Sequence, residues 1–112
     1  MELQTKQLTP EAILIHINGR FDAAVVEQVK RLWIENEEVH FVITDLSETT
    51  FIDSIGLATL VSGLKTTRQR GGELILLKPT EPVKVILELT RMNIVFKIAP
   101  TLEEAQAFLK PL

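Results

Sequence analysis

Short apolar runs that are typical of strands alternate with segments of helical periodicity along nearly the whole chain. The run AILIHIN at 12–18 alternates isoleucines with other residues, and a shorter strand is expected before it at 3–8. The runs at 39–46 and 74–77 are apolar on both faces, and 94–98 is predicted as a short last strand. This alternation constrains the fold more than any other feature, because it predicts right-handed crossovers and a mostly parallel sheet.

Each helix between these strands is predicted from a capping residue or an apolar stripe. Asp22 and Thr80 are expected N-caps, and Thr101 with Glu104 fits the capping box that opens a final helix. The segment 54–69 carries apolar residues at i, i+3, i+4 and i+7. The order β-β-α-β-α-β-α-β-α predicts an α/β domain with a mixed, mostly parallel sheet of about five strands and about four helices. The first strand can run antiparallel at an edge.

The boundaries and inward faces of these elements are also predicted. Gly19 is expected to end the second strand, and the polar stretch SETT at 47–50 is expected to be a turn. Leu89 is counted among the apolar residues of the third helix, and Ala105, Phe108 and Leu109 are expected on the inward face of the last.

Composition and charge limit the classes of partner. The 112 residues are most simply one domain, residues 1–112, and the net charge of −3 provides no basic field for nucleic acid or anionic lipid. The absence of Cys excludes disulfides and thiolate catalysis. No apolar run approaches the roughly 18 residues of a membrane span, and the N-terminus lacks a secretory apolar region. We therefore expect a cytoplasmic protein without direct membrane insertion and without nucleic acid as a partner.

Enzyme signatures are absent from the sequence. It contains no phosphate-binding glycine loop, no nucleophile elbow and no paired histidines with zinc-ligand spacing. His16 and His40 lie in predicted strands, where a structural role is favoured. Asp45 ends a strand like the phospho-acceptor of a response-regulator receiver, but the receiver also needs an acidic pair where this chain offers only Glu11. The sequence thus predicts a protein that is not an enzyme and needs no cofactor or metal, with Asp45 bonded to a turn backbone.

A carboxylate and a hydroxyl meet where a buried strand passes into the second helix, in the stretch FIDSIGLATLVSGLK at 51–65. Asp53 and Ser54 are both good N-caps for the unpaired N–H groups of a helix start. Gly56 in the first turn is consistent with close packing of the helix against a strand. Capping explains these residues only in part, since an exposed hydroxyl at a helix start is also open to modification.

The second helix is predicted to face the core through four residues, Leu57, Leu60, Val61 and Leu64. Ile55, Thr59 and Ser62 lie on a different strip and are expected to be at least partly exposed. An apolar residue beside the cap, continued by small polar side chains, indicates a surface for contact with a partner.

Three segments together resemble a known family. They are GRFDAAVVEQV at 19–29, VITDLSETTFIDSIGLATL at 42–60 and GGELILLKPTEPVKVILELTRMNIVFKIAPTLEEA at 71–105. The chain is similar to a STAS domain of the anti-sigma factor antagonist family, and the similarity covers nearly the whole chain without a large insertion. The short Asp-Ser-x-Gly-Leu element carries most of it, since it follows a buried strand and opens the second helix.

The resemblance implies a regulatory binding module switched by phosphate. In this family the serine after the Asp is phosphorylated by an anti-sigma factor that is a serine kinase. The unphosphorylated antagonist binds that kinase and frees the sigma factor, and a metal-dependent serine phosphatase restores the hydroxyl. On this chain the acceptor would be Ser54, and the implied partner-binding residues are Asp22, Asp53, Ser54, Ile55, Gly56, Thr59 and Ser62.

Two residues depart from the family pattern, and two other functions stay open. Arg20 stands where an acidic residue is frequent, and Ile55 replaces a small residue, so both bear on the choice of partner. STAS domains also serve as accessory subunits without a switch, for example in bacterial lipid-transport complexes in membranes. A small enzyme or nucleotide-binding domain using the helix start at Ser54 as an anion site is the third alternative.

Overall fold

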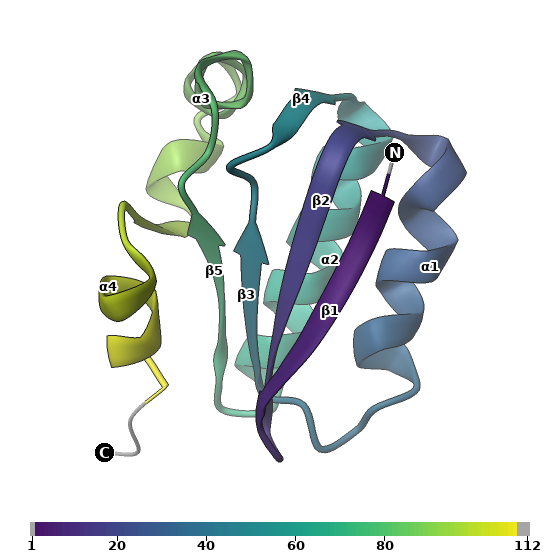
Figure 1. The fold of residues 1–112 in the computed structure, drawn as a ribbon, viewed down its shortest axis with the longest axis vertical. Helices are drawn as coiled ribbons and strands as arrows, with labels where there is room; N and C mark the ends of the chain where they lie inside the picture. The colour runs from purple at the N-terminus through teal and green to yellow at the C-terminus, as the bar shows by residue number, and fades with distance from the viewer. Residues whose placement is uncertain (1, 110–112) are drawn as a thin grey trace.

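A mixed six-stranded sheet forms the centre of the computed structural model, which describes residues 2–109 (Figure 1). The chain order begins with two strands and then alternates strands with helices, as predicted, with one extra strand. The elements are β1 (Glu2–Thr9), β2 (Ala12–Phe21), α1 (Ala23–Ile34), β3 (Phe41–Asp45), β4 (Thr49–Ile52), α2 (Ser54–Gln69), β5 (Glu73–Leu77), α3 (Glu81–Leu89), the short 3-10 helix η1 (Met92–Ile94), β6 (Lys97–Ala99) and α4 (Leu102–Ala107).

The strands lie in the order β1-β2-β3-β5-β6, with β4 paired to β2 outside this path. β1 runs antiparallel to β2 at the edge, and the pairs β2–β3, β3–β5 and β5–β6 are parallel. The predicted α/β class and mostly parallel sheet are therefore confirmed, including the antiparallel edge strand. Figure 1 shows β4 beyond the end of β3, alongside the last part of β2.

β4 was predicted only at its end, since 51–52 was expected to close a buried strand but no separate strand was counted there. The stretch 47–50 was expected to be a turn, but Thr49 already pairs with Gly19 at the start of β4. Gly19 does not end the second strand either: it takes a φ of 94°, the register shifts there, and β2 continues to Phe21. A glycine bulge of this kind lets one strand change its neighbour from β3 to β4.

The two faces of the sheet are covered unequally. Ile13, Ile15 and Ile17 point to the face that packs against α1 and α2, in a core that also contains Trp33 and Leu60. A smaller cluster on the other face, made of Ile43, Ile75, Leu77, Ala99 and Ala105, packs beneath α4. The pattern of alternating isoleucines therefore identified the better covered face.

Several predictions for the last third of the chain were wrong in detail. The final strand is Lys97–Ala99 and not 94–98, because residues 92–94 form the 3-10 helix. Thr80 occupies the N-cap position of α3, but its hydroxyl donates to the backbone oxygen of Thr49 at 2.6 Å and does not cap the helix. Phe108 is exposed, whereas it was expected to face inward, and Leu89, counted among the apolar residues of its helix, is 76% exposed.

The N-cap half of the capping box predicted for the last helix is confirmed by its backbone bond. The Thr101 hydroxyl accepts from the N–H of Glu104 at 3.2 Å. Ala105 is buried as expected, and Leu109 is half-buried against the smaller cluster.

Candidate functional site

The starts of α1 and α2 lie side by side at one end of the sheet. β2 passes into α1 through Asp22, and β4 passes into α2 through Asp53. The two strands pair in parallel through Phe21 and Ile52, and the N–H of Asp53 donates to the Phe21 carbonyl at 3.4 Å. Because a helix carries partial positive charge at its N-terminus, two such ends meet here.

Each helix start is capped by an aspartate. The Asp22 Oδ1 accepts from the N–H of Ala24 at 3.1 Å, and the Asp53 Oδ1 accepts from the N–H of Gly56 at 2.8 Å. Asp22 was predicted as an N-cap, and this is confirmed. At the second helix the cap is Asp53, whose extended backbone precedes the helix, so Ser54 is the first helical residue and is exposed.

Gly56 belongs to the packing of α2 and not to its surface. It is buried, and a Cβ at this position would lie 2.5 Å from the backbone oxygen of Phe21. The prediction that Gly56 allows close packing of helix against strand is confirmed. Its predicted place among the partner-binding residues stays a prediction, which the burial of Gly56 does not support.

The buried strip of α2 is rotated from the predicted one. It consists of Gly56, Thr59, Leu60, Gly63, Leu64 and Thr67, whereas Val61 is exposed and Leu57 only half-buried. Glycines and threonines fill this strip because the helix lies close to the sheet: a Cβ on Gly63 would lie 2.7 Å from the Leu74 Cδ1.

This rotation removes one predicted contact residue and keeps two. Thr59 was expected to be exposed but is 1% exposed, and its hydroxyl donates to the Ile55 carbonyl at 2.8 Å. Ile55 is 49% exposed and Ser62 is half-buried, as the prediction required. The accessible residues at this helix start are thus Asp22, Asp53, Ser54 and Ile55, which we call the switch surface.

Arg20, which the sequence singled out, and Phe51, which it did not, are neighbours of the switch surface. They pair across β2 and β4, and the Arg20 Cζ lies 4.3 Å from the centroid of the Phe51 ring. The Arg20 Nε also lies 3.5 Å from the Asp22 Oδ2. The β-branched residues in the run TTFI at 49–52 were the signal for a strand that would have placed Phe51 beside β2.

His16 is held between two carboxylates close to the same end of the sheet. Its Nδ1 lies 3.0 Å from the Asp45 Oδ2, and its Nε2 lies 2.9 Å from the Glu48 Oε1. Partial burial alone would lower the pKa of His16, but the bonds and charges of Asp45 and Glu48 outweigh it and raise the pKa. The structural role predicted for His16 is therefore confirmed as a link between β2, β3 and the turn that follows.

Asp45 also binds the turn backbone, as predicted. Its Oδ1 accepts from the N–H of Ser47 at 3.0 Å. Burial alone would raise the pKa of Asp45, but the bonds from Ser47 and His16 outweigh it, so the pKa lies below its usual value.

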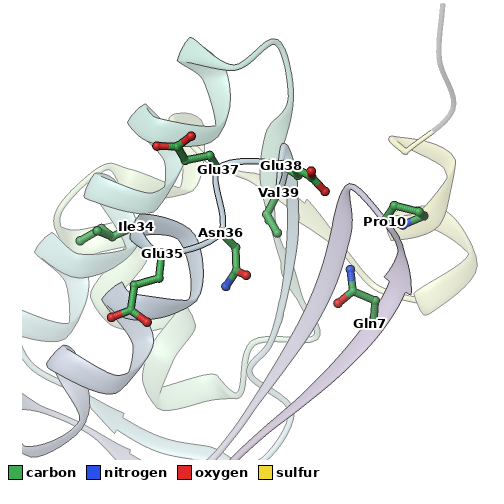
Figure 2. Close-up of a pocket in the computed structure, with 8 residues that line it drawn as sticks. All are labelled: Gln7, Pro10, Ile34, Glu35, Asn36, Glu37, Glu38 and Val39. Atoms are coloured by element: carbon green, nitrogen blue, oxygen red, sulfur yellow. The ribbon is translucent and has the colours of Figure 1, made fainter.

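A hollow of about 760 Å³ lies at the opposite end of the sheet (Figure 2). Its wall includes Glu35, Glu37 and Glu38 from the segment between α1 and β3, together with Gln7 and Pro10 from the first hairpin. None of the residues singled out from the sequence lines this hollow. In open α/β sheets ligands bind beyond the carboxyl ends of the strands, whereas this segment leads into the amino end of β3.

Two searches of residues 2–109 bear on other functions. Within that range no group of three or more His, Cys, Asp or Glu side chains is arranged to hold a metal ion. No helix in the same range is long and apolar enough to cross a membrane.

Comparison with known proteins agrees with the resemblance seen in the sequence. The family model for the STAS domain matches residues 4–105. An anti-sigma-B factor antagonist of Listeria monocytogenes is 28% identical over 100 residues, which cover 88% of this chain and 88% of the relative.

Solved structures share the fold at lower identity. The unphosphorylated form of the anti-sigma factor antagonist SpoIIAA matches with a TM-score of 0.85 and 20% identity over 99% of both chains. The phosphorylated form of Bacillus SpoIIAA matches with a TM-score of 0.76 and 23% identity over 97% of this chain and all of that one. A sulfate transporter family protein from Wolinella succinogenes matches with a TM-score of 0.77 and 20% identity, over 92% and 88% of the two chains. Since the family model spans nearly all of the described residues, this chain belongs to the STAS domain family.

Proposed function

We propose that this chain is an anti-sigma factor antagonist that is switched by phosphorylation of Ser54. The unphosphorylated chain binds an anti-sigma factor serine kinase and frees the sigma factor, and the phosphorylated chain is released. The observation that supports the proposal most directly is the exposure of Ser54 as the first residue of α2. In this role the chain binds and is modified, and the chemistry belongs to its partners.

The modification is a phosphoryl transfer. The Ser54 oxygen attacks the γ-phosphorus of ATP, the bond from that phosphorus to the bridging oxygen breaks, and ADP leaves while a base of the kinase takes the hydroxyl proton. A serine phosphatase reverses the state, since water attacks the phosphorus and the Ser54 oxygen leaves with a proton.

The site tolerates a phosphate without loss of the fold. Ser54 is on the surface, and the N-terminus of the 16-residue helix α2 favours an anion. The added charge of about −1.5 to −2 changes the surface beside Asp53 and Ile55 and leaves the core packing untouched. A partner fitted to a neutral hydroxyl loses affinity through repulsion and desolvation. A change from 1:99 to 99:1 in bound population requires about 5.5 kcal/mol of differential binding.

The proposal is tested by incubating the chain with ATP and each serine-kinase anti-sigma factor of its own organism. Mass spectrometry should detect one added phosphoryl group, and Ser54→Ala should abolish the addition. Ser47→Ala is the matched control, because Ser47 is an exposed serine in the neighbouring β3–β4 turn. A chain that stays unmodified with every such kinase would contradict the proposal.

A charge substitution tests the binding half of the switch. Ser54→Asp should fold normally, since aspartate is well tolerated in the first turn of a helix, and should fail to bind the kinase in calorimetry. One pair of results would show that phosphate does not control the complex. In it, Ser54→Ala is no longer phosphorylated, but Ser54→Asp still binds the kinase.

A second candidate function is an accessory subunit of a membrane transporter complex, of the lipid-transport type or another. The shared fold with a sulfate transporter family protein from Wolinella succinogenes favours this alternative. It predicts that the chain co-purifies with a transporter and that Ser54→Ala leaves the complex intact.

A further inference from the structure

Arg20 lies on the exposed side of the β2–β4 pair, next to the switch surface. The residues after the Arg20–Phe51 pair are Phe21 and Ile52, which are 0% and 2% exposed. Because side chains alternate along a strand, Arg20 and Phe51 point away from that buried pair. The ion pair between Arg20 and Asp22 shows that the Asp22 carboxylate lies on the same side.

The present contacts of Arg20 are weak. The Nε of Arg20 is 3.5 Å from the Asp22 Oδ2, beyond the length of a good charge-assisted hydrogen bond, and the side chain is 62% exposed. The guanidinium lies 4.3 Å from the Phe51 ring centroid, at a site open to solvent. Exposed contacts of both kinds contribute little, so the guanidinium leaves them at small cost.

A phosphate on Ser54 would offer this guanidinium a stronger partner. The phosphate would be carried by the residue directly after Asp53 and would lie near Asp22. Both carboxylates would repel it, whereas the positive ends of the two helices would attract it. Arginine binds phosphate through two parallel N–H bonds, which an exposed carboxylate at 3.5 Å does not provide here.

The geometry brings the two groups within reach. Ser54 is three residues beyond Phe51, so their Cα atoms lie at most about 11 Å apart. The guanidinium of Arg20 already lies beside the Phe51 ring. An arginine side chain and a phosphoserine side chain span this gap when they turn toward each other.

We propose that phosphate on Ser54 draws the Arg20 guanidinium away from Asp22 and Phe51 and forms an ion pair with it. One modification then produces three changes at the surface: a new anion, an uncovered aromatic ring and a freed carboxylate. This inference rests on the proposed function only for the natural source of the phosphate. Arg20 departs from the family pattern. Under this inference it determines how the surface that a partner meets differs between the phosphorylated and unphosphorylated chains.

The test uses the full chain with phosphoserine placed at position 54 by genetic incorporation, so no kinase is needed. A ³¹P NMR titration should give a phosphate midpoint about 0.5 pH unit or more lower in the parent chain than in Arg20→Gln, because a nearby cation favours the dianion. Arg20→Lys should retain part of this lowering. Arg31→Gln is the matched control, since Arg31 is a similarly exposed arginine 3.9 Å from the carboxylate of Glu35, and it should leave the midpoint unchanged.

Proton NMR provides a second measurement on the Arg20 side chain itself. In the unphosphorylated chain the Phe51 ring should shift the Arg20 side-chain signals upfield, and phosphorylation should remove that shift. Equal midpoints for Arg20→Gln and Arg31→Gln, or Arg20 signals that do not respond to the phosphate, would overturn the inference. So would loss of the native spectrum when phosphoserine is installed. A kinase assay that fails to modify Ser54 would count against the proposed function and leave this titration unaffected.

Discussion

The two ends of the parallel sheet differ in helix polarity and in charge. Helices α1 and α2 both begin at the end where Ser54 lies, with Asp22 and Asp53 as their caps. The segment that follows the C-terminus of α1 forms the hollow at the other end, where Glu35 and Glu37 add negative charge to the negative pole of the helix. The helix poles therefore favour an anion at the Ser54 end and disfavour one at the acidic end.

This difference shows that the hollow and the site of the proposed function lie at opposite ends of the sheet. The hollow at the acidic end has a volume of about 760 Å³. Glutamates line it, and none of the functional residues predicted from the sequence contributes to its wall. The Ser54 end is a surface rather than a cavity, with a hydroxyl, two capping carboxylates and an exposed Ile55. A docking function needs such a surface, because a partner protein approaches a face and does not enter a pocket.

The largest predicted effects concern glycines that pack against a backbone carbonyl at either end. A Cβ on Gly72 would lie 1.7 Å from the His40 oxygen, and a Cβ on Gly56 would lie 2.5 Å from the Phe21 oxygen. We expect Gly72→Ala and Gly56→Ala each to lower the free energy of unfolding by about 2 kcal/mol or more, with Gly72→Ala the more severe. Urea unfolding measures both.

Gly71 provides the control for this pair of substitutions. No atom lies within 4 Å of a Cβ placed there, but its φ is 83°. Gly71→Ala should cost only about 1 kcal/mol, from the backbone conformation alone, and Gly71→Asn should cost less because asparagine tolerates positive φ. If Gly71→Ala proves as damaging as Gly72→Ala, close contact is not what limits that end of the sheet.

The next effect in size is the loss of the cap at the Ser54 end. Asp53→Ala removes the acceptor of the Gly56 N–H, and we expect the free energy of unfolding to fall by about 1 kcal/mol. Glu37→Ala at the acidic end should change it by less than about 0.5 kcal/mol, since Glu37 is exposed. Thermal and urea unfolding of the two variants compare the two ends of the sheet directly. Equal losses in the free energy of unfolding would contradict the assignment of Asp53 as the N-cap.

The smallest predicted effect is a dependence of stability on pH. The pKa of His16 is raised in the fold, so its link to Asp45 and Glu48 contributes fully below the unfolded pKa of 6.5 and is lost as the pH rises through the higher folded pKa. Urea unfolding between pH 5.5 and 8.5 should therefore show stability falling with pH. His16→Gln should flatten this slope, and Glu48→Gln should reduce it. Parallel curves for the parent chain and His16→Gln would show that the link contributes no charge-dependent stability.

Much of the fold could be predicted because its signals are local. Asp22 and Thr101 cap helices through bonds to residues two and three positions on, and such bonds follow from short sequence patterns. The apolar runs of β2, β3 and β5 likewise marked the centre of the sheet. Ser54 was placed at a helix start and is found there, exposed.

The features that escaped prediction depend on contacts between distant parts of the chain. β4 is four residues long, and its pairing with β2 joins Arg20 to Phe51 across 31 positions. His16 meets Asp45 only because parallel register places them opposite each other. The buried strip of α2 was misjudged because hydrophobicity favoured Val61, whereas the close approach of helix and sheet selects the smaller Thr59.

The double pairing of β2 limits how this chain can change in length. β2 pairs first with β3 and then, past Gly19, with β4, so the connection at 46–48 has to match the distance between those two partners. One inserted residue there would shift β4 by a position, turning Phe51 toward the core and Ile52 toward solvent. Variants of this sequence should therefore keep the number of residues in 46–48 constant, while an insertion beside the exposed residues Glu37 and Glu38 at the far end should be tolerated better.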